Sequence, residues 1–152
     1  MTPRLAVEAD VAGVRACVRA AYAHYVERIG REPAPMIADY AALVARGVVW
    51  VIGDASVEAV LVMYPSPTES GDALFIENIA VAPGQQGRGL GRALLDFAER
   101  YARQHGLPEL RLYTNALMTE NLAMYAHLGF VESDRRTKDG FQRVYLRKPL
   151  GA

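Results

Sequence analysis

The fold is decided by the stretch Gln86-Gly87-Arg88-Gly89-Leu90-Gly91-Arg92, in which three glycines stand at alternate positions. Because glycine has no Cβ atom, a ligand can approach this backbone closely, and consecutive amide N–H groups can point to one place. The run from Ala93 to Glu99 predicts a helix, whose first amides are unpaired donors at its positive end. The spacing therefore predicts a loop that holds a phosphate group, with Arg88 and Arg92 adding positive charge.

Two common phosphate-binding motifs do not fit this spacing. A dinucleotide fingerprint, G-x-G-x-x-G, that starts at Gly87 would need a glycine at position 92, where the chain has arginine. A P-loop needs Lys and then Ser or Thr after its last glycine, but Leu90 and Gly91 follow Gly89. The loop therefore belongs to neither of these nucleotide-binding classes.

The segments around the loop make the pattern more specific. The strand-like run Leu74–Val81 precedes the loop, and an amphipathic helix follows it. In that setting, Gln86-x-x-Gly89-x-Gly91 resembles the acyl-CoA pyrophosphate loop of the GNAT superfamily of N-acyltransferases. A second segment, Asn121-Leu122-Ala123-Met124-Tyr125-Ala126-His127-Leu128-Gly129-Phe130, resembles the late helix of that family, which carries an Asn, a Tyr one turn later and then Gly-Phe.

The resemblance covers nearly the whole chain and implies the GNAT fold. We expect one domain over residues 1–152, of α/β (α+β) class, with a mixed, mostly antiparallel sheet of six to seven strands, helices on both faces and the order β-α-α-β-β-β-α-β-α-β-β. Strands are expected at 4–7, 48–52, 57–63, 74–81, 110–114, 130–133 and 141–146. Helices are expected at 11–29 with Asp10 as N-cap, at 36–45, at 90–105 and at 119–128, and a loop at 65–72.

Composition limits the classes of partner. The 152 residues hold 17 Lys plus Arg and 17 Asp plus Glu, so no whole-chain attraction to nucleic acid or to an anionic membrane is expected. Met1–Leu5 lacks the apolar core of a signal peptide, and no apolar run approaches the ~18 residues of a membrane span, so we expect a cytoplasmic protein. The single cysteine, Cys17, excludes an internal disulfide and a multi-cysteine metal site, and its apolar neighbours predict that it is buried.

The resemblance implies acetyl-CoA as the acyl donor and no metal. In the family, the two strands beside the loop separate, and the pantetheine arm of the cofactor pairs with the strand backbone between them. Here those strands end near Val81 and Thr114, and the Val81 N–H would stabilise the thioester oxygen as it gains negative charge. The expected cofactor-binding residues are Ile79, Ala80, Val81, Gln86, Gly87, Arg88, Gly89, Leu90, Gly91, Arg92, Asn121 and Tyr125.

Tyr125 is the candidate general acid and Glu77 the candidate general base. A tyrosine hydroxyl is acidic enough to protonate the leaving thiolate of coenzyme A, and Asn121 lies one turn earlier, where it would bond the cofactor arm. Glu77 stands in an apolar strand, where an unpaired carboxylate is costly, and related enzymes often carry a Glu or His in this strand. A Glu77 paired with an arginine or exposed to solvent would not have this role, and His24 or a bound water are alternative bases.

The acceptor is less well defined by the sequence. In the family, substrate selection usually lies in the segment that joins the first two helices, here Tyr25–Met36, and in the loop before the central strand, here Pro65–Asp72. Tyr25, Arg28 and Glu77 are the candidate acceptor-binding residues. Arginines in the first segment would accept a carboxylate, whereas acids in the second would attract a cationic amine, so the acceptor stays open between a small amine and a peptide.

These expectations describe an acetyl-CoA-dependent N-acetyltransferase that moves an acetyl group to a primary amine by direct attack in a ternary complex. Two alternatives remain: an enzyme with a different acyl donor or acceptor, and a non-catalytic sensor that binds acyl-CoA. Family members often form homodimers, sometimes through their last strands, and we expect Phe141–Leu146 to present an edge strand for one.

Overall fold

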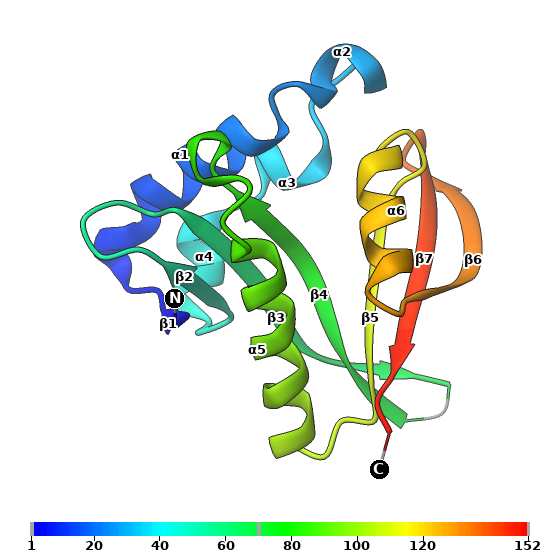
Figure 1. The fold of residues 1–152 in the computed structure, drawn as a ribbon. Coiled ribbons are helices and arrows are strands. Elements are labelled where there is room, and N and C mark those ends of the chain that lie inside the picture. The colour runs from blue at the N-terminus through cyan, green and yellow to red at the C-terminus, as the bar shows by residue number, and fades with distance from the viewer. Residues whose placement is uncertain (1, 70, 152) are drawn as a thin grey trace. The chain divides into compact units, whose positions relative to one another are not determined.

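A computed structural model describes residues 2–69 and 71–151 of the chain (Figure 1). The strands form a seven-stranded sheet in the order β1-β2-β3-β4-β5-β7-β6. β4 and β5 are parallel, whereas β1–β2, β2–β3, β5–β7 and β6–β7 are antiparallel. The expected α/β class and mostly antiparallel sheet are confirmed. In chain order the elements are β1 (Arg4–Leu5), the 3-10 turn η1 (Glu8–Asp10), α1 (Val11–Tyr22), α2 (Tyr25–Ile29), α3 (Ala34–Ile37), α4 (Tyr40–Ala45), β2 (Val49–Ile52), β3 (Ala59–Thr68), β4 (Gly71–Val81), the 3-10 turn η2 (Pro83–Gln85), α5 (Leu90–Gln104), β5 (Glu109–Asn115), α6 (Thr119–His127), β6 (Val131–Lys138) and β7 (Phe141–Pro149).

The chain divides into two compact units. The first unit contains the chain up to Met63 together with Asn78–Phe97, and the second contains Tyr64–Glu77 and the chain from Ala98 onward. β3, β4 and α5 therefore each contribute residues to both units.

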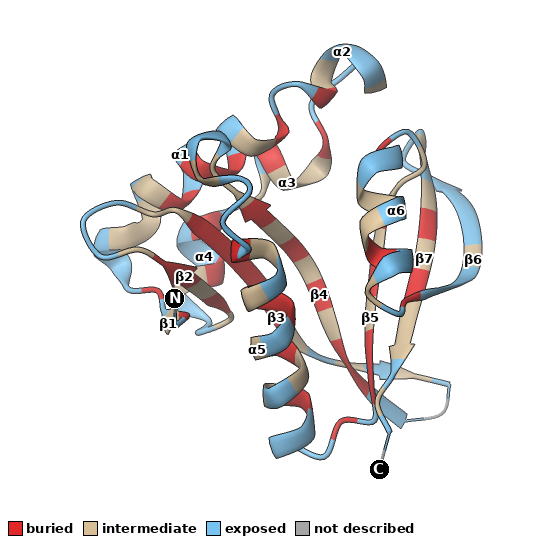
Figure 2. Ribbon diagram, viewed as in Figure 1, coloured by how far each residue is buried: buried red, intermediate tan, exposed pale blue. Residues whose placement is uncertain are grey.

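A core of helix and strand residues holds the first unit together. α1 buries Val14, Cys17, Val18 and Tyr22, which stand at positions i, i+3, i+4 and i+8 and so share one helix face. Residues Ala59–Met63 of β3 are fully buried, and Figure 2 shows buried residues along β2 and this part of β3. Burial raises the pKa of the Cys17 thiol to about 11. The expected buried cysteine is therefore confirmed.

The Asp10 carboxylate binds residues of the first strand and the turn after it instead of the amides of α1. Its carboxylate accepts hydrogen bonds from the Arg4 guanidinium at 2.9 and 3.0 Å and from the Val7 N–H at 2.8 Å. Asp10 occupies the N-cap position of α1, as expected, but its side chain makes no cap hydrogen bond there, because Arg4 and Val7 take the oxygens that a cap would use. The hydrogen bond from Arg4 holds the pKa of Asp10 below its ordinary value.

The second unit contains the antiparallel strands β5, β7 and β6. Along β5, Leu110, Leu112 and Thr114 are buried, and the residues between them are half-buried. This alternation places one face of the strand in the core and leaves the other partly open. β6 is exposed over most of its length (Figure 2). The β6–β7 turn has positive φ at Asp139 (54°) and Gly140 (81°), as a two-residue hairpin turn that matches strand twist requires.

Both N-terminal helices expected from the sequence are divided in the structure. The apolar pattern over 11–29 is shared by α1 and α2, which are separated by Ala23 and His24. The second expected helix is interrupted at Ala38, which is extended, and Asp39 then caps α4 by accepting a hydrogen bond from the Ala42 N–H at 3.1 Å. A side chain that caps a new helix favours a restart over continuation.

Two expectations about the sheet were wrong. The expected loop at 65–72 is mostly strand, because β3 continues to Thr68 and β4 begins at Gly71, while Ser70 lies outside the described residues. Pro65 and Pro67 lie beyond Val62, the last β3 residue that pairs with β2, so their missing N–H groups cost no bond to that strand. The segment Phe141–Leu146 is also not an edge, since β7 pairs with β5 on one side and β6 on the other.

The buried Glu109 carboxylate joins two strands of the second unit and provides a test of the fold. It accepts hydrogen bonds from Arg111 Nε at 3.1 Å and Arg147 Nε at 3.0 Å. Burial acts to raise the pKa of Glu109, but the hydrogen bonds from Arg111 and Arg147 outweigh burial and lower it.

We expect Glu109→Gln to lower the free energy of unfolding by about 2 kcal/mol at pH 7, measured by urea denaturation.

The pH dependence of this loss of stability follows from the direction in which folding shifts the pKa of Glu109. A carboxylate whose pKa is lowered by folding stabilises the native state above its unfolded pKa of about 4.3, and the benefit disappears as the pH falls through the native value. The difference between Glu109→Gln and wild type should therefore shrink below about pH 4. Glu132→Gln, which removes an exposed ion pair with Arg135, is the control and should unfold like wild type. A loss that is equal at pH 7 and pH 3 would contradict the role given to the Glu109 charge.

Candidate active site

The glycine loop adopts the conformation that its sequence predicts. Gly87 and Gly89 have φ values of 86° and 77°, a left-handed backbone that glycine adopts without strain. Leu90 begins α5 and is only 1% exposed, so its side chain fixes the start of the helix in the core of the first unit. The Ala93 N–H donates to the Gly89 carbonyl at 3.0 Å. The N–H groups of residues 90 to 92 therefore precede the first helical bond and have no acceptor within the helix.

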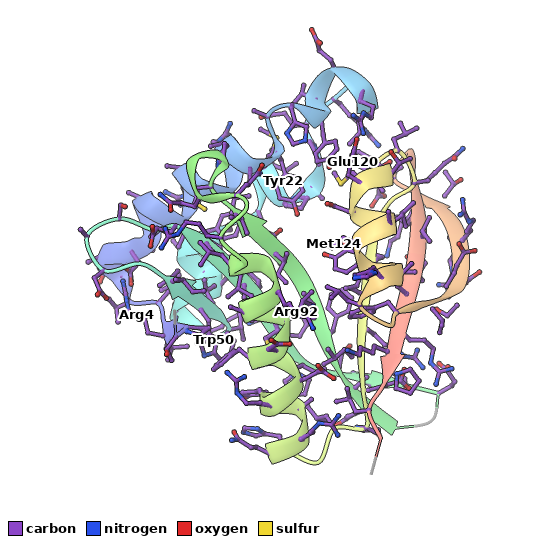
Figure 3. All side chains as sticks on the ribbon, in the orientation of Figure 1. Arg4, Tyr22, Trp50, Arg92, Glu120 and Met124 are labelled. Atoms are coloured by element: carbon purple, nitrogen blue, oxygen red, sulfur yellow. The ribbon has the colours of Figure 1, made fainter. Side chains whose placement is uncertain are left out.

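The two arginines of the loop differ in what they contact. Arg88 pairs with Glu58 at 2.9 Å and also donates to the Gln85 side chain. Arg92, labelled on α5 in Figure 3, makes no ion pair with any residue in the described part of the chain. Of the two expected cations, Arg92 is thus the one with charge available for an anion.

The end of β4 lies next to this loop. A Cβ atom added to Gly91 would come within 3.8 Å of Val81 Cγ2. Ala80 is buried, and the Ile79 carbonyl accepts a hydrogen bond from the Tyr22 hydroxyl at 3.1 Å. Of the expected cofactor-binding residues, Val81 and Gly91 therefore lie side by side in the first unit.

A buried hydrogen-bond network holds this strand end in place. The Tyr22 hydroxyl, labelled in Figure 3, donates to Asn78 Oδ1 at 2.7 Å, and Asn78 Nδ2 donates to the Tyr40 hydroxyl at 3.0 Å. Tyr40 in turn donates to the Pro35 carbonyl at 2.5 Å. The network fixes Asn78 on β4 to three helices, α1, α3 and α4. Asn78 was not among the expected site residues, although a single Asn in an apolar strand indicates a buried hydrogen bond.

The parallel pairing of β4 and β5 is short. It consists of Leu74 with Leu110, Phe75 with Arg111 and Ile76 with Leu112. β4 continues to Val81 and β5 to Asn115. The pairing therefore stops before either strand ends, at the residue that precedes Glu77.

Asn121 and Tyr125 share one face of α6 in the second unit. Tyr125 is 6% exposed, and its ring meets Phe130 edge-on with 5.4 Å between centroids. The Phe130 N–H closes the helix by donating to the Tyr125 carbonyl at 3.0 Å, while Gly129 between them has φ 98°. Asn121 Nδ2 lies 3.7 Å from Met118 Sδ. Tyr125, Gly129 and Phe130 of the sequence motif thus act together to end the helix, whereas Asn121 lies in its first turn.

Glu77 is half-buried on β4, and its Oε1 accepts a hydrogen bond from the Tyr64 hydroxyl at 2.8 Å. Within residues 2–69 and 71–151 it forms no ion pair with an arginine. Tyr64 was not expected as part of the site. It lies in the strand next to β4, where the sequence predicted only the margin of a loop.

The remaining candidates lie on α2 and near it. Tyr25 is 5% exposed and packs on the His24 ring, with centroids 3.9 Å apart. The Arg28 guanidinium lies 5.2 Å from the Tyr25 centroid. His24 and Arg28 are themselves exposed. Tyr25 therefore serves the packing of this segment, and the two polar residues are at the surface.

Residues 2–69 and 71–151 contain no group of three or more His, Cys, Asp or Glu residues placed to bind a metal ion. Over those ranges, every helix is too short or too polar to cross a bilayer.

Curated proteins that resemble this chain are acetyltransferases. Mycothiol acetyltransferase of Beutenbergia cavernae is 44% identical over 52 residues, which cover 34% of this chain and 18% of the relative. N-alpha-acetyltransferase 80 of Mus musculus is 35% identical over 80 residues, which cover 53% of this chain and 22% of the relative. The chain thus spans about a fifth of the length of these two relatives.

Solved structures resemble the whole fold. A GNAT-family acetyltransferase from Streptococcus agalactiae superposes with a TM-score of 0.79 at 18% identity, covering 99% of this chain and 96% of that one. A GNAT-family acetyltransferase from Elizabethkingia anophelis, solved with acetyl-CoA bound, has a TM-score of 0.58 at 24% identity, covering 67% of this chain and 75% of that one. The model of the family described as Acetyltransferase (GNAT) family matches residues 16–130. The chain belongs to this family.

Proposed function

We propose that this protein transfers an acetyl group from acetyl-CoA to a primary amine of a small molecule or peptide, as a single catalytic domain over residues 1–152. The observation that carries the proposal is the glycine loop, whose left-handed Gly87 and Gly89 lead into the free N–H groups at the start of α5. Membership of the GNAT family and the acetyl-CoA in one related structure support acetyl-CoA as the donor.

In this proposal the first unit binds the diphosphate and the pantetheine arm. Amides of residues 87–92 would donate to the phosphates, and Arg92 would add charge because it has no ion-pair partner in the described residues. The short pairing of β4 with β5 leaves strand backbone beyond Ile76 for the amides of the arm. Asn121 would bond the same arm. Leu90 would contribute its backbone alone, since its side chain is buried.

Acetyl-CoA supplies an acetyl group activated as a thioester. Glu77, or a water that it holds, accepts one proton from the substrate ammonium, and the neutral nitrogen attacks the thioester carbon. The Val81 N–H stabilises the carbonyl oxygen while it carries negative charge. As the new C–N bond forms and the C–S bond breaks, Tyr125 donates its hydroxyl proton to the leaving sulfur and regains one from the nitrogen through solvent. The products are the N-acetylated amine, coenzyme A and one proton, which Glu77 releases to solvent.

The first test of the loop replaces one glycine at a time. Gly89→Ala should weaken acetyl-CoA binding at least about tenfold, because a Cβ at φ 77° strains the loop and stands where the phosphates approach. Gly47→Ala is a matched control, since Gly47 has φ 73° and equally open surroundings but lies after α4. Isothermal titration with acetyl-CoA measures both. If the two variants bind alike, the loop does not hold the phosphates.

The second test concerns the general acid. Tyr125→Phe keeps the ring that packs on Phe130 and removes only the hydroxyl, so kcat should fall at least about tenfold while the dissociation constant for acetyl-CoA changes little. Tyr101→Phe, in α5, serves as the control and should leave kcat intact. Unchanged turnover in Tyr125→Phe would remove this residue from the acid role.

The overall reaction is tested by following coenzyme A release with a panel of amines, amino acids and peptides. Release that depends on an added amine supports the proposal. Tight binding of acetyl-CoA without turnover on any acceptor would favour a sensor instead of an enzyme.

A further inference from the structure

Four aromatic rings cross the partly open face of the second unit. Tyr64, Phe75, Tyr113 and Tyr145 come from β3, β4, β5 and β7, and their neighbouring centroids are 5.6, 5.8 and 5.5 Å apart. We call these four residues the aromatic ladder. All four are half-buried, whereas the residues that alternate with them on β4, β5 and β7 are buried. Two of the rings also contact guanidinium groups, since Arg136 lies 4.8 Å from the Tyr145 centroid and Arg143 lies 4.1 Å from the Tyr113 centroid. The half-buried edges of the ladder are the part that a ligand could contact.

A cavity of about 220 Å³ lies beside two of the four rings, Phe75 and Tyr145. Its lining also includes the hydroxyl residues Ser66, Thr68 and Ser133 and the charged residues Arg111, Asp134 and Arg136, whereas Glu77 and Arg143 lie outside it. A cavity of ~150 Å³ is enough for a benzene ring. The cavity therefore has room for a single planar ring.

The arginines of this face differ in whether a carboxylate neutralises them. Arg111 and Arg147 both pair with Glu109, and Arg136 pairs with Asp134. The Arg143 guanidinium instead lies 4.1 Å from the Tyr113 centroid and forms no ion pair or side-chain hydrogen bond with any residue in the described ranges. Contact with a ring leaves the charge and the N–H donors of a guanidinium available to an anion.

Glu77 provides the opposite charge on the same face. It accepts the Tyr64 hydroxyl and has no cationic partner in the described residues. Phe75 pairs with Arg111 in the parallel strands, and Glu77 and Tyr113 each follow two residues later on the same side. Burial raises the pKa of Tyr113, Arg143 lowers it, and Glu77, Tyr145 and Asp139 raise it. One unpaired anion and one unpaired cation therefore lie around a single half-buried ring. Such an arrangement is complementary to a ligand that carries both charges.

We propose that the acceptor is a free amino acid with a planar ring side chain, whose ammonium binds Glu77, whose carboxylate binds Arg143 and whose ring packs on Phe75 and Tyr145. The proposal deepens the proposed function and rests on it. Phe75 and Glu77 are two residues apart on one strand face, about 7 Å, which suits a ring and an amine separated by two carbons. The products are the N-acetyl amino acid and coenzyme A.

A peptide N-terminus fits these charges less well. Its α-carbon carries an amide in place of a carboxylate, so Arg143 would meet a neutral carbonyl. A hydrogen bond to a charged group is roughly twice as strong as one between neutral groups. The face should therefore discriminate against peptides and amino acid amides.

The test compares L-phenylalanine, L-phenylalaninamide and L-alanine as acceptors for wild type, Arg143→Gln, Arg143→Lys and Arg135→Gln. Wild type should use phenylalanine at least about tenfold better than either other amine in kcat/KM. Arg143→Gln should remove the preference over the amide by raising KM for phenylalanine alone, and Arg143→Lys should restore part of it. Arg135→Gln, which removes an exposed arginine paired with Glu132 on β6, should keep the preference.

Calorimetric titration of L-phenylalanine in the presence of coenzyme A separates this proposal from the proposed function. If no amine is acetylated but phenylalanine binds wild type and not Arg143→Gln, the proposed function fails, and the residues named here form a binding site for an amino acid that is not an acceptor. If alkylamines or peptides are acetylated and amino acids are not, the proposed function stands and the acceptor site is wrong. Equal use of phenylalanine and its amide, or a preference that survives Arg143→Gln in a variant with wild-type unfolding, also overturns the acceptor site.

Discussion

In the proposed function, the glycine loop depends on one constraint: the first amides of α5 must stay available to a ligand while the start of the helix is held in place. Leu90 meets the second requirement because its side chain is buried at the start of the helix. Gly87 and Gly89 meet the first, since their left-handed backbone turns the chain without a side chain between the amides and solvent. The cost of leaving polar groups unpaired is small while water reaches them. A negatively charged ligand then gains from donors that need no rearrangement.

Elsewhere the polar groups of the interior are paired. No buried side-chain nitrogen or oxygen in the described residues lacks a hydrogen-bond partner. In the first unit the Tyr22–Asn78–Tyr40 network satisfies the amide on β4, and in the second the Glu109 carboxylate is shared by Arg111 and Arg147. Against this background, Glu77 and Arg143 are distinctive because each is half-buried and lacks an opposite charge in those residues. Charges left in that state are more often found where a ligand completes the pairing.

The sequence was sufficient for features that local patterns determine. Glycine spacing predicts the loop, and apolar alternation predicts the strands in their order along the chain. Gly129-Phe130 predicts where the last helix ends. Breaks at Ala23-His24 and Ala38 were not predictable from apolar spacing, which continues across both. The strand through Pro65 and Pro67 was missed because proline usually indicates a loop. Proline is tolerated in a strand where its missing N–H would have had no partner, and which residues pair is decided by the tertiary structure. Tyr64, Tyr113 and Arg143 were missed for the same reason, since only strand pairing brings them together.

The buried Cys17 has a practical consequence for enzymology. Disulfide reagents react with thiolates, and this thiol stays protonated at neutral pH because burial raises its pKa to about 11. Cys17 is also the sole cysteine of the 152 residues. A colorimetric thiol reagent added during turnover would therefore read the released coenzyme A with little background from the native protein. Because the Cys17 thiol is buried, oxidants do not reach it in the folded chain.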